Sequence, residues 1–260
     1  VGLGWAEAAL AFQELGRSGV GGPFVATAAA HGVGLADGVT GLLPSGATGP
    51  IGATGAGDAA GPRLVEHLDR LDSLLVLDVD ADDAGEVRRV PVPPGRPVER
   101  PLDPLTPVWL VDELPTGEVV GDAEVAHRLA LRVALLAAAQ QVGLGAAALA
   151  TGTAYAKERH QFGRPIGSFQ AVKHLLADAA VDLEVARAAV DAAAVTLDEG
   201  GDVDRAVRSA RIVASSAAST ATRASIQVHG GMGYTWELPA HLYLKRALVL
   251  DQLLPPAKLR

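Results

Sequence analysis

Apolar residues recur at helical spacing near the start of the chain. Trp5, Phe12 and Leu15 fall on one face of the segment 1–19, and a glycine-rich run ends the pattern. This spacing predicts one amphipathic helix, and a second short helix is predicted over residues 24–32. Both are interpreted as helices that turn an apolar face toward a core, without a role in ligand binding.

The second half of the chain shows the same helical period over four longer segments. Asp122 and Asp202 are suitable N-caps for two of them, and Pro239 suits the first turn of the last. Glycine-containing runs separate the segments, and such short connections are typical of a bundle. The sequence therefore predicts a four-helix bundle, with helices at about residues 122–157, 168–198, 202–228 and 239–253.

Between these helical regions the pattern changes to short β-prone runs. SLLVLDVD, EVRRVPV and PVWLVDEL are bounded by Asp, Gly and Pro, and they predict a small antiparallel sheet domain within residues 63–121. The preceding stretch, 34–62, is rich in Gly, Ala and Thr and is interpreted as a linker. Its run GPIGATGAGDAAGP is not interpreted as a phosphate loop, because it lacks the Gly-Lys-Ser/Thr ending.

Composition narrows the functions open to this 260-residue chain. Hydrophobic residues make up 49% but aromatics only 4%, so Ala, Val and Leu dominate, as they do in closely packed helices. A net charge of −8 argues against binding to nucleic acid or to an anionic membrane surface. The chain has no cysteine, and its seven histidines show no paired ligand spacing, so neither disulfides nor a metal site is expected.

The sequence predicts neither a membrane span nor a secretion signal. The most apolar stretch, 129–150, is interrupted by Arg132, Gln140 and Gln141. The N-terminus lacks a charged region followed by an apolar run, which a signal peptide requires. A cytoplasmic location without a membrane partner is therefore expected.

Two glycine-punctuated segments carry the candidate chemistry. They are AYAKERHQFGRPIGSFQAVKHLLAD, at 154–178, and SIQVHGGMGYTWELPAHLYLKRA, at 225–247. In the first, Arg159 is suited to a bidentate grip on a pyrophosphate, Gln161 offers both a donor and an acceptor, and Phe162 offers a flat face for a ring. The alternative is that Arg159 pairs with the acid before it and that Phe162 belongs to the core.

The second segment places Gln227 close to a glycine pair, Gly230 and Gly231. Glycines let a backbone approach a nucleotide closely, although the same pair could simply terminate a helix. His229 lies just before the pair and is considered as a catalytic base, but no carboxylate stands nearby in the sequence to orient it.

These segments, in this order, resemble the two signature segments of the acyl-CoA dehydrogenase C-terminal domain. The resemblance implies a mainly α fold with a small β domain and a C-terminal four-helix bundle. It divides the chain into a truncated N-terminal helical domain at 1–50, a β-rich middle domain at 51–121 and the bundle at 122–260. It also implies FAD as cofactor, bound across a subunit interface by Arg159, Gln161, Phe162, Gln227, Gly230 and Gly231.

The chain departs from this family where the catalytic glutamate is expected. Acyl-CoA dehydrogenases use that residue to remove the α-proton of the thioester while the β-hydride passes to the flavin. Counting along the sequence, its two positions in the family fall near Val133 and near Leu254 and Pro255, none of which is acidic. Asp251 lies close to the second position and is the alternative base; otherwise the chain is expected to contribute no catalytic residue.

The β region also shows no match to the two strands, one Thr-Glu-Pro-like and one containing Trp, that line the flavin ring in the family. A chain that keeps the contacts to FAD but loses the base resembles the arm-lending subunit of actinobacterial α2β2 acyl-CoA dehydrogenases. That implies a homologous partner subunit, an acyl-CoA substrate such as a steroid side-chain CoA, and electron-transfer flavoprotein as electron acceptor. The alternatives are a homo-oligomeric dehydrogenase with a displaced acid and a non-catalytic assembly protein.

Overall fold

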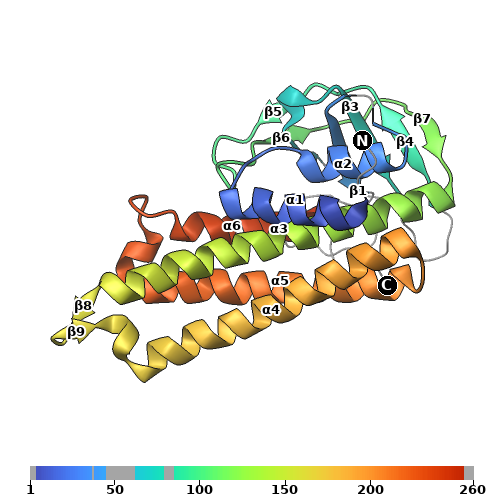
Figure 1. Cartoon of the computed structure of the whole chain (residues 1–260). Coiled ribbons are helices and arrows are strands. Elements are labelled where there is room, and N and C mark those ends of the chain that lie inside the picture. Colours follow the sequence, from blue (N-terminus) through green and yellow to red (C-terminus); the bar gives the residue numbers. More distant parts are fainter. Residues whose placement is uncertain (1–3, 37, 45–61, 79–84, 255–260) are drawn as a thin grey trace. The chain divides into compact units, whose positions relative to one another are not determined.

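The computed structural model describes residues 4–36, 38–44, 62–78 and 85–254. These residues form two compact units: the first holds the residues up to Val20 together with 134–251, and the second holds 21–133 with the residues from Gln252 onward. The helix α3, Ala123–Glu158, continues from the second unit into the first (Figure 1). The glycine-rich run considered as a phosphate loop, at 49–62, lies almost wholly outside the described residues.

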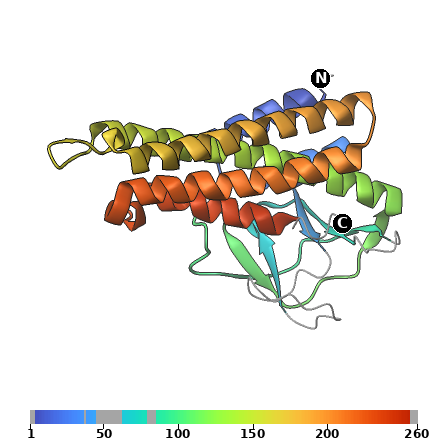
Figure 2. The ribbon, with the colours of Figure 1, turned by 90° about the horizontal axis from the view of Figure 1, so that it is seen from below.

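The first unit is a bundle of long helices. Figure 2 shows α4 and α5 running side by side, and the short helix α1 also packs along α4. The predicted four-helix bundle is confirmed, and each predicted helix end lies within two residues of the observed one. Besides α3, the helices of this unit are α1, Trp5–Ser18, α4, Gln170–Glu199, α5, Val203–His229, and α6, Ala240–Leu253.

The predicted caps of α3 and α5 are confirmed. The Asp122 carboxylate accepts a hydrogen bond from the backbone N–H of Val125 at 3.0 Å, and Asp202 does the same for Arg205 at 3.1 Å. These bonds satisfy donors that the first turn of a helix leaves without partners. Both caps could be predicted because the partner lies three residues away.

The start of α1 is capped from a distant part of the chain. Asp198, near the end of α4, accepts hydrogen bonds from the backbone N–H groups of Trp5 and Ala6 at 2.8 and 2.9 Å. Through this cap α1 belongs to the bundle unit. The two compact units thus cut the chain differently from the three expected domains, and that three-domain division stays a prediction.

Helices α1 and α3 cross in direct backbone contact at two glycines. A Cβ at Gly16 would overlap the carbonyl oxygen of Gln140, and a Cβ at Gly143 would overlap that of Gln13. Only glycine allows this approach, so the crossing point is fixed by the sequence of both helices. Farther along α3, Gly152 packs against the backbone of Ser225 on α5.

Helix α3 is the one helix in the described part of the chain that is long and apolar enough to cross a bilayer. In the structure, 83% of its most apolar window is buried inside the protein. Gln140 and Gln141, which interrupt its apolar run, are buried as well. The apolar character of α3 is therefore used for packing against its neighbours.

The second unit contains α2, Phe24–Gly32, and two small sheets. Buried apolar residues such as Leu43, Leu74, Val90 and Val111 form its core. One sheet has the order β1-β3-β4-β7, with strands Thr40–Pro44, Ser73–Leu77, Val87–Val90 and Glu118–Gly121. The other has the order β2-β6-β5, with strands Arg63–Glu66, Val108–Val111 and Arg96–Pro97, and the 3-10 turn η1, Leu68–Arg70, follows β2.

One expectation for this region is confirmed and one is wrong. The described strands within 63–121 pair antiparallel with one another, as predicted, but β1, from before this range, adds a parallel pairing with β3, from Thr40 opposite Ser73 to Pro44 opposite Leu77. The stretch interpreted as a linker also contains a strand, β1 itself. A parallel pair needs a long connection between its strands, and the glycine-rich stretch with β2 supplies it, so this pairing is not visible in local sequence.

We expect Gly143→Ala to lower the free energy of unfolding by about 2 kcal/mol. Overpacking against a backbone carbonyl costs about 3 kcal/mol, and the higher helix propensity of alanine than of glycine offsets about 1 kcal/mol of this cost. Gly231→Ala is the matched control, because a Cβ at that position meets nothing within 4 Å. Chemical unfolding of both variants measures the difference, and equal stability of the two would contradict the proposed helix crossing.

Candidate functional site

A two-residue hairpin follows α3. Strand β8, His160–Gln161, pairs antiparallel with β9, Arg164–Pro165. The turn residues Phe162 and Gly163 have φ angles of 53° and 77°, in the left-handed region that such tight hairpins require. Figures 1 and 2 show the hairpin projecting beyond the adjoining helices. The 3-10 turn η2, Ile166–Ser168, then leads into α4.

Phe162, at the tip of this hairpin, is not part of the core. Its side chain is 91% exposed, and its φ of 53° is costly for a residue other than glycine. The ring makes an edge-to-face contact with Phe169 at 6.1 Å between centroids, and the guanidinium of Arg164 lies 4.2 Å from the centre of the Phe169 ring. The hairpin therefore holds an aromatic ring in solvent at its tip.

Arg159 lies at the base of the hairpin with its backbone fixed on both sides. Its N–H donates to the carbonyl oxygen of Tyr155 at 2.9 Å, and its own carbonyl accepts from the N–H of Ile166 at 2.7 Å. The side chain is exposed. Within the described residues its guanidinium forms no ion pair, so the alternative pairing with Glu158 is not observed.

The second candidate segment begins where α5 ends. His229 is the last residue of α5, and Gly230, with a φ of 62°, starts the 3-10 turn η3, Gly230–Tyr234. Gln227 and both glycines are exposed. At Gly231 the backbone is not left-handed and a Cβ would meet nothing within 4 Å, so this chain alone gives no steric reason for glycine there.

A pocket of about 450 Å³ joins the two segments in the bundle unit. It contains three of the six predicted cofactor residues, whereas Phe162, Gln227 and Gly230 lie outside its lining. Of the other lining residues, only His229 had been considered from the sequence, as a catalytic base. The lining consists of Tyr155, Arg159, Gln161, Ile166, Val228, His229, Gly231 and Met232.

Tyr155 and His229 form one wall of this pocket. Their ring centroids lie 4.4 Å apart and their planes are tilted by 32°. His229 is only 5% exposed, and its Nδ1 lies 2.7 Å from the carbonyl oxygen of Ser225, one turn back on α5. Because a carbonyl only accepts, Nδ1 must carry the proton. Among the described residues a backbone carbonyl, and no carboxylate, orients this ring.

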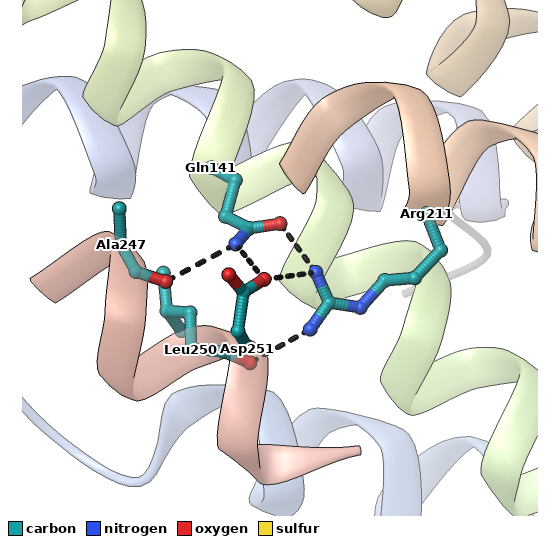
Figure 3. A network of polar contacts seen from close by, with 5 residues as sticks. All are labelled: Gln141, Arg211, Ala247, Leu250 and Asp251. Carbon is teal, nitrogen blue, oxygen red and sulfur yellow. Dashed lines mark hydrogen bonds and ion pairs between the residues drawn. The ribbon is translucent and has the colours of Figure 1, made fainter. Parts of the chain in front are cut away.

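Asp251, the candidate for a displaced base, does not line the pocket. It belongs to a network around the fully buried side chain of Arg211 on α5 (Figure 3). Arg211 donates to the carboxylate of Asp251 at 3.4 Å, to the carbonyl oxygen of Leu250 at 2.8 Å and to the amide oxygen of Gln141. Gln141 in turn donates to Asp251 at 2.7 Å and to the carbonyl oxygen of Ala247 at 3.2 Å.

Burial lowers the pKa of Arg211, and the charge of Asp251 and its hydrogen bond oppose this shift. A guanidinium stays charged even then. The buried positive charge of Arg211 is therefore stabilised by the Asp251 carboxylate and by the carbonyl and amide oxygens that accept its hydrogen bonds. The Asp251 carboxylate is thus engaged in holding a buried cation. This explains the acid at this position without a catalytic role.

The two positions at which the family places its catalytic glutamate do not supply a base in this chain. Val133 and Leu254 are both fully buried, while Pro255 lies outside the described residues. No carboxylate lines the pocket within the described part of the chain. The described residues contain no group of three or more His, Asp or Glu side chains placed to hold a metal ion.

Comparison with known proteins identifies the family. The profile of the acyl-CoA dehydrogenase C-terminal domain matches residues 124–253, which covers the bundle from the start of α3 to the end of α6. The acyl-CoA dehydrogenase IpdE2 of Mycolicibacterium smegmatis is 33% identical over 97% of this chain and 76% of its own length. The chain belongs to the acyl-CoA dehydrogenase family.

Solved structures agree with this assignment. The ChsE4-ChsE5 complex from Mycobacterium tuberculosis contains a chain that matches with a TM-score of 0.80 at 26% identity, over 96% of this chain and 76% of that one. The Tcur3481-Tcur3483 steroid ACAD matches with a TM-score of 0.77 at 24% identity, over 96% and 77%. The second likeness shows the fold alone. The predicted acyl-CoA dehydrogenase-like fold is confirmed.

Membership of this family confirms FAD as the cofactor. The pocket residues fit such a group: Arg159 offers a cation without a partner among the described residues, and Gly231 leaves open space for a close approach. A dinucleotide diphosphate needs both features. The individual contacts of Arg159, Gln161, Phe162, Gln227, Gly230 and Gly231 with FAD stay predictions.

We expect Asp251→Asn to act on stability rather than on catalysis. Removing the countercharge of Arg211 should lower the free energy of unfolding by about 1–3 kcal/mol, less than for a fully buried pair because the Asp251 side chain is 24% exposed. Turnover of acyl-CoA per bound flavin should fall far less than the roughly 100- to 10,000-fold expected for loss of a general base.

The matched control for this variant is Glu124→Gln. Glu124 forms an exposed pair with Arg128 at 3.8 Å, and its loss should change neither stability nor turnover appreciably. Chemical unfolding and turnover per flavin are measured for both variants. Near-complete loss of turnover in Asp251→Asn, with FAD still bound, would identify Asp251 as the base.

Proposed function

We propose that this chain is a subunit of an FAD-dependent acyl-CoA dehydrogenase and contributes contacts to FAD across a subunit interface. A homologous partner supplies the catalytic glutamate and the surface for the flavin ring, in an α2β2 heterotetramer. The complex introduces an α,β double bond into an acyl-CoA thioester in the cytoplasm. The observation that carries this proposal is the projecting hairpin, whose Phe162 is 91% exposed.

The hairpin and pocket together form half of a binding site. An aromatic ring that is 91% exposed and held in an unfavourable backbone conformation is stabilised further when another surface covers it. The exposed guanidinium of Arg159 forms no ion pair within the described part of the chain. An open site of this kind covers one side of an extended dinucleotide, and a second chain has to cover the other side.

The division of chemistry follows from the residues present. FAD held at this site would supply the acceptor for a hydride from the β-carbon of the acyl group. Arg159 would hold its diphosphate, Gln161 would bond to neighbouring oxygens, and Phe162 would cover a ring face. Because no carboxylate lines the described pocket, the α-proton passes to a carboxylate of the partner.

The proposed heteromeric assembly and the proposed substrate rest on the similarity of this chain to complexes of the same family. ChsE4 and ChsE5 are two proteins that form one complex, which supports a heteromeric assembly for this chain. The steroid ACAD supports a bulky steroid side-chain CoA as the substrate, by fold alone. Electron-transfer flavoprotein is the proposed acceptor of the electrons from reduced FAD.

We expect the chain purified alone to bind FAD poorly and to bind it stoichiometrically when co-expressed with its partner subunit. Half a site offers too few contacts to offset the loss of freedom of the ligand. The visible absorbance of flavin per mole of protein measures this for both preparations. Stoichiometric FAD in the homogeneous chain alone would favour the homo-oligomeric alternative, and absence of flavin from every preparation would favour an assembly protein.

Arg159→Ala should reduce the affinity of the assembled enzyme for FAD about 10- to 100-fold. A charge-assisted contact with a diphosphate is worth on the order of 1.5–3 kcal/mol. Arg205→Ala is the matched control. It also removes one positive charge from an exposed position, but Arg205 lies at the start of α5, whereas the pocket lies at the end of this helix. Flavin titration of both variants gives the affinities. Unchanged affinity in Arg159→Ala would show that the hairpin does not hold the cofactor.

A further inference from the structure

We infer that Trp236, His241 and Lys245 form a binding site for an acidic side chain of another protein chain, at the start of α6. None of the three lines the pocket beside Arg159, and none is among the predicted contacts with FAD. The site does not depend on the proposed role of the chain in holding FAD, so either proposal can fail without the other.

The first observation is a buried histidine whose hydrogen-bonding capacity is unused. His241 is the second residue of α6 and is only 7% exposed. Both ring nitrogens are buried, and neither has a hydrogen-bond partner within the described residues. A neutral imidazole offers one donor and one acceptor. Buried polar atoms without partners are rare and costly in proteins, and a polar ligand that reaches this ring relieves the cost.

The second observation is the side chain that packs against this ring. Trp236, in the loop before α6, meets His241 edge to face, with centroids 4.9 Å apart and planes at 83°. The Lys245 ammonium lies 4.8 Å from the centre of the Trp236 ring, yet Trp236 is 74% exposed. Contacts of these two kinds are weak at an exposed position. A ligand can therefore move the indole aside at small cost and reach the imidazole.

The charge of the site favours a carboxylate. Lys245 forms no ion pair within the described part of the chain, not even with Glu237, the acid nearest to Trp236 in the sequence. His241 adds no charge, because burial lowers its pKa and the charge of Lys245 lowers it further. The backbone of Thr235 opposes this shift but lies outside hydrogen-bond geometry. One cation near a helix N-terminus matches a monoanion better than a phosphate dianion.

The surroundings of the site favour a protein chain over a free acid. Tyr234, two residues before Trp236, is 75% exposed, and among the large apolar side chains of the described residues only Phe162 is more exposed. Tyr and Trp are enriched in the centres of protein interfaces, where they supply a large contact area. A small acid would leave both rings in water. A chain that brings an Asp or Glu side chain to Lys245 covers them.

Two peptides test the site on the full chain without any substitution. Acetyl-Ala-Glu-Ala-amide presents a carboxylate, and acetyl-Ala-Gln-Ala-amide presents its neutral isostere. We expect the glutamate peptide to bind about tenfold tighter and to change the emission of Trp236, which comparison with Trp236→Phe identifies. Equal binding of the two peptides overturns the inference. So does binding of inorganic phosphate or of acetate as tight as that of the glutamate peptide.

His241→Phe separates a role in binding from a role in the fold. Phenylalanine keeps a ring against Trp236 and removes both unpartnered nitrogens, so the midpoint of chemical unfolding of the free chain should rise or stay the same. Binding of the glutamate peptide should weaken about tenfold. A lower midpoint would show that His241 serves the fold, and unchanged binding would remove it from the site; either result overturns the inference.

Substitutions of Lys245 test the charge. Lys245→Gln should weaken binding of the glutamate peptide about tenfold, whereas Lys245→Arg, which keeps the charge, should stay near the parent. Lys173→Gln is the matched control, because it removes the same charge from an exposed position at the start of α4. Equal affinity in Lys245→Gln and the parent, or an equal loss in the control, would overturn the inference. No flavin is present in these titrations, so their outcome is independent of the FAD site.

Discussion

A buried positive charge holds three helices of the bundle together. Arg211 on α5 is fully buried, and its guanidinium reaches Gln141 on α3 and both a carboxylate and a carbonyl on α6. These partners must all stay in place, because an uncompensated charge in the interior is very costly. The relative positions of α3, α5 and α6 are thereby constrained, and with them the pocket at the end of α5.

Much of the fold follows from local sequence. The bundle helices could be placed from their apolar period, and the caps by Asp122 and Asp202 from partners three residues away. The cap that Asp198 gives to α1 and the parallel pairing of β1 with β3 could not, because their partners lie far along the chain. Nothing in the local sequence identifies such partners.

The same limit applies to the site. Arg159 and Gln161 could be proposed because they stand within three residues of each other in a segment that resembles a signature of the family. Tyr155 and His229 meet only through the register of α3 against α5, which close packing at Gly152 sets. Asp251 is a candidate base in the sequence alone because no local pattern points to Arg211, its buried partner. Side chains that meet between helices need the three-dimensional structure.

Phe162 has a consequence for how such a chain evolves. Its conformation and exposure cost this fold stability, and the edge-to-face contact with Phe169 offsets that cost only in part. Selection for the residue therefore acts through a surface encoded by another gene or by a second copy of this one. The tip and its receiving surface have to change together, and a cell that makes one without the other carries an exposed aromatic ring open to aggregation.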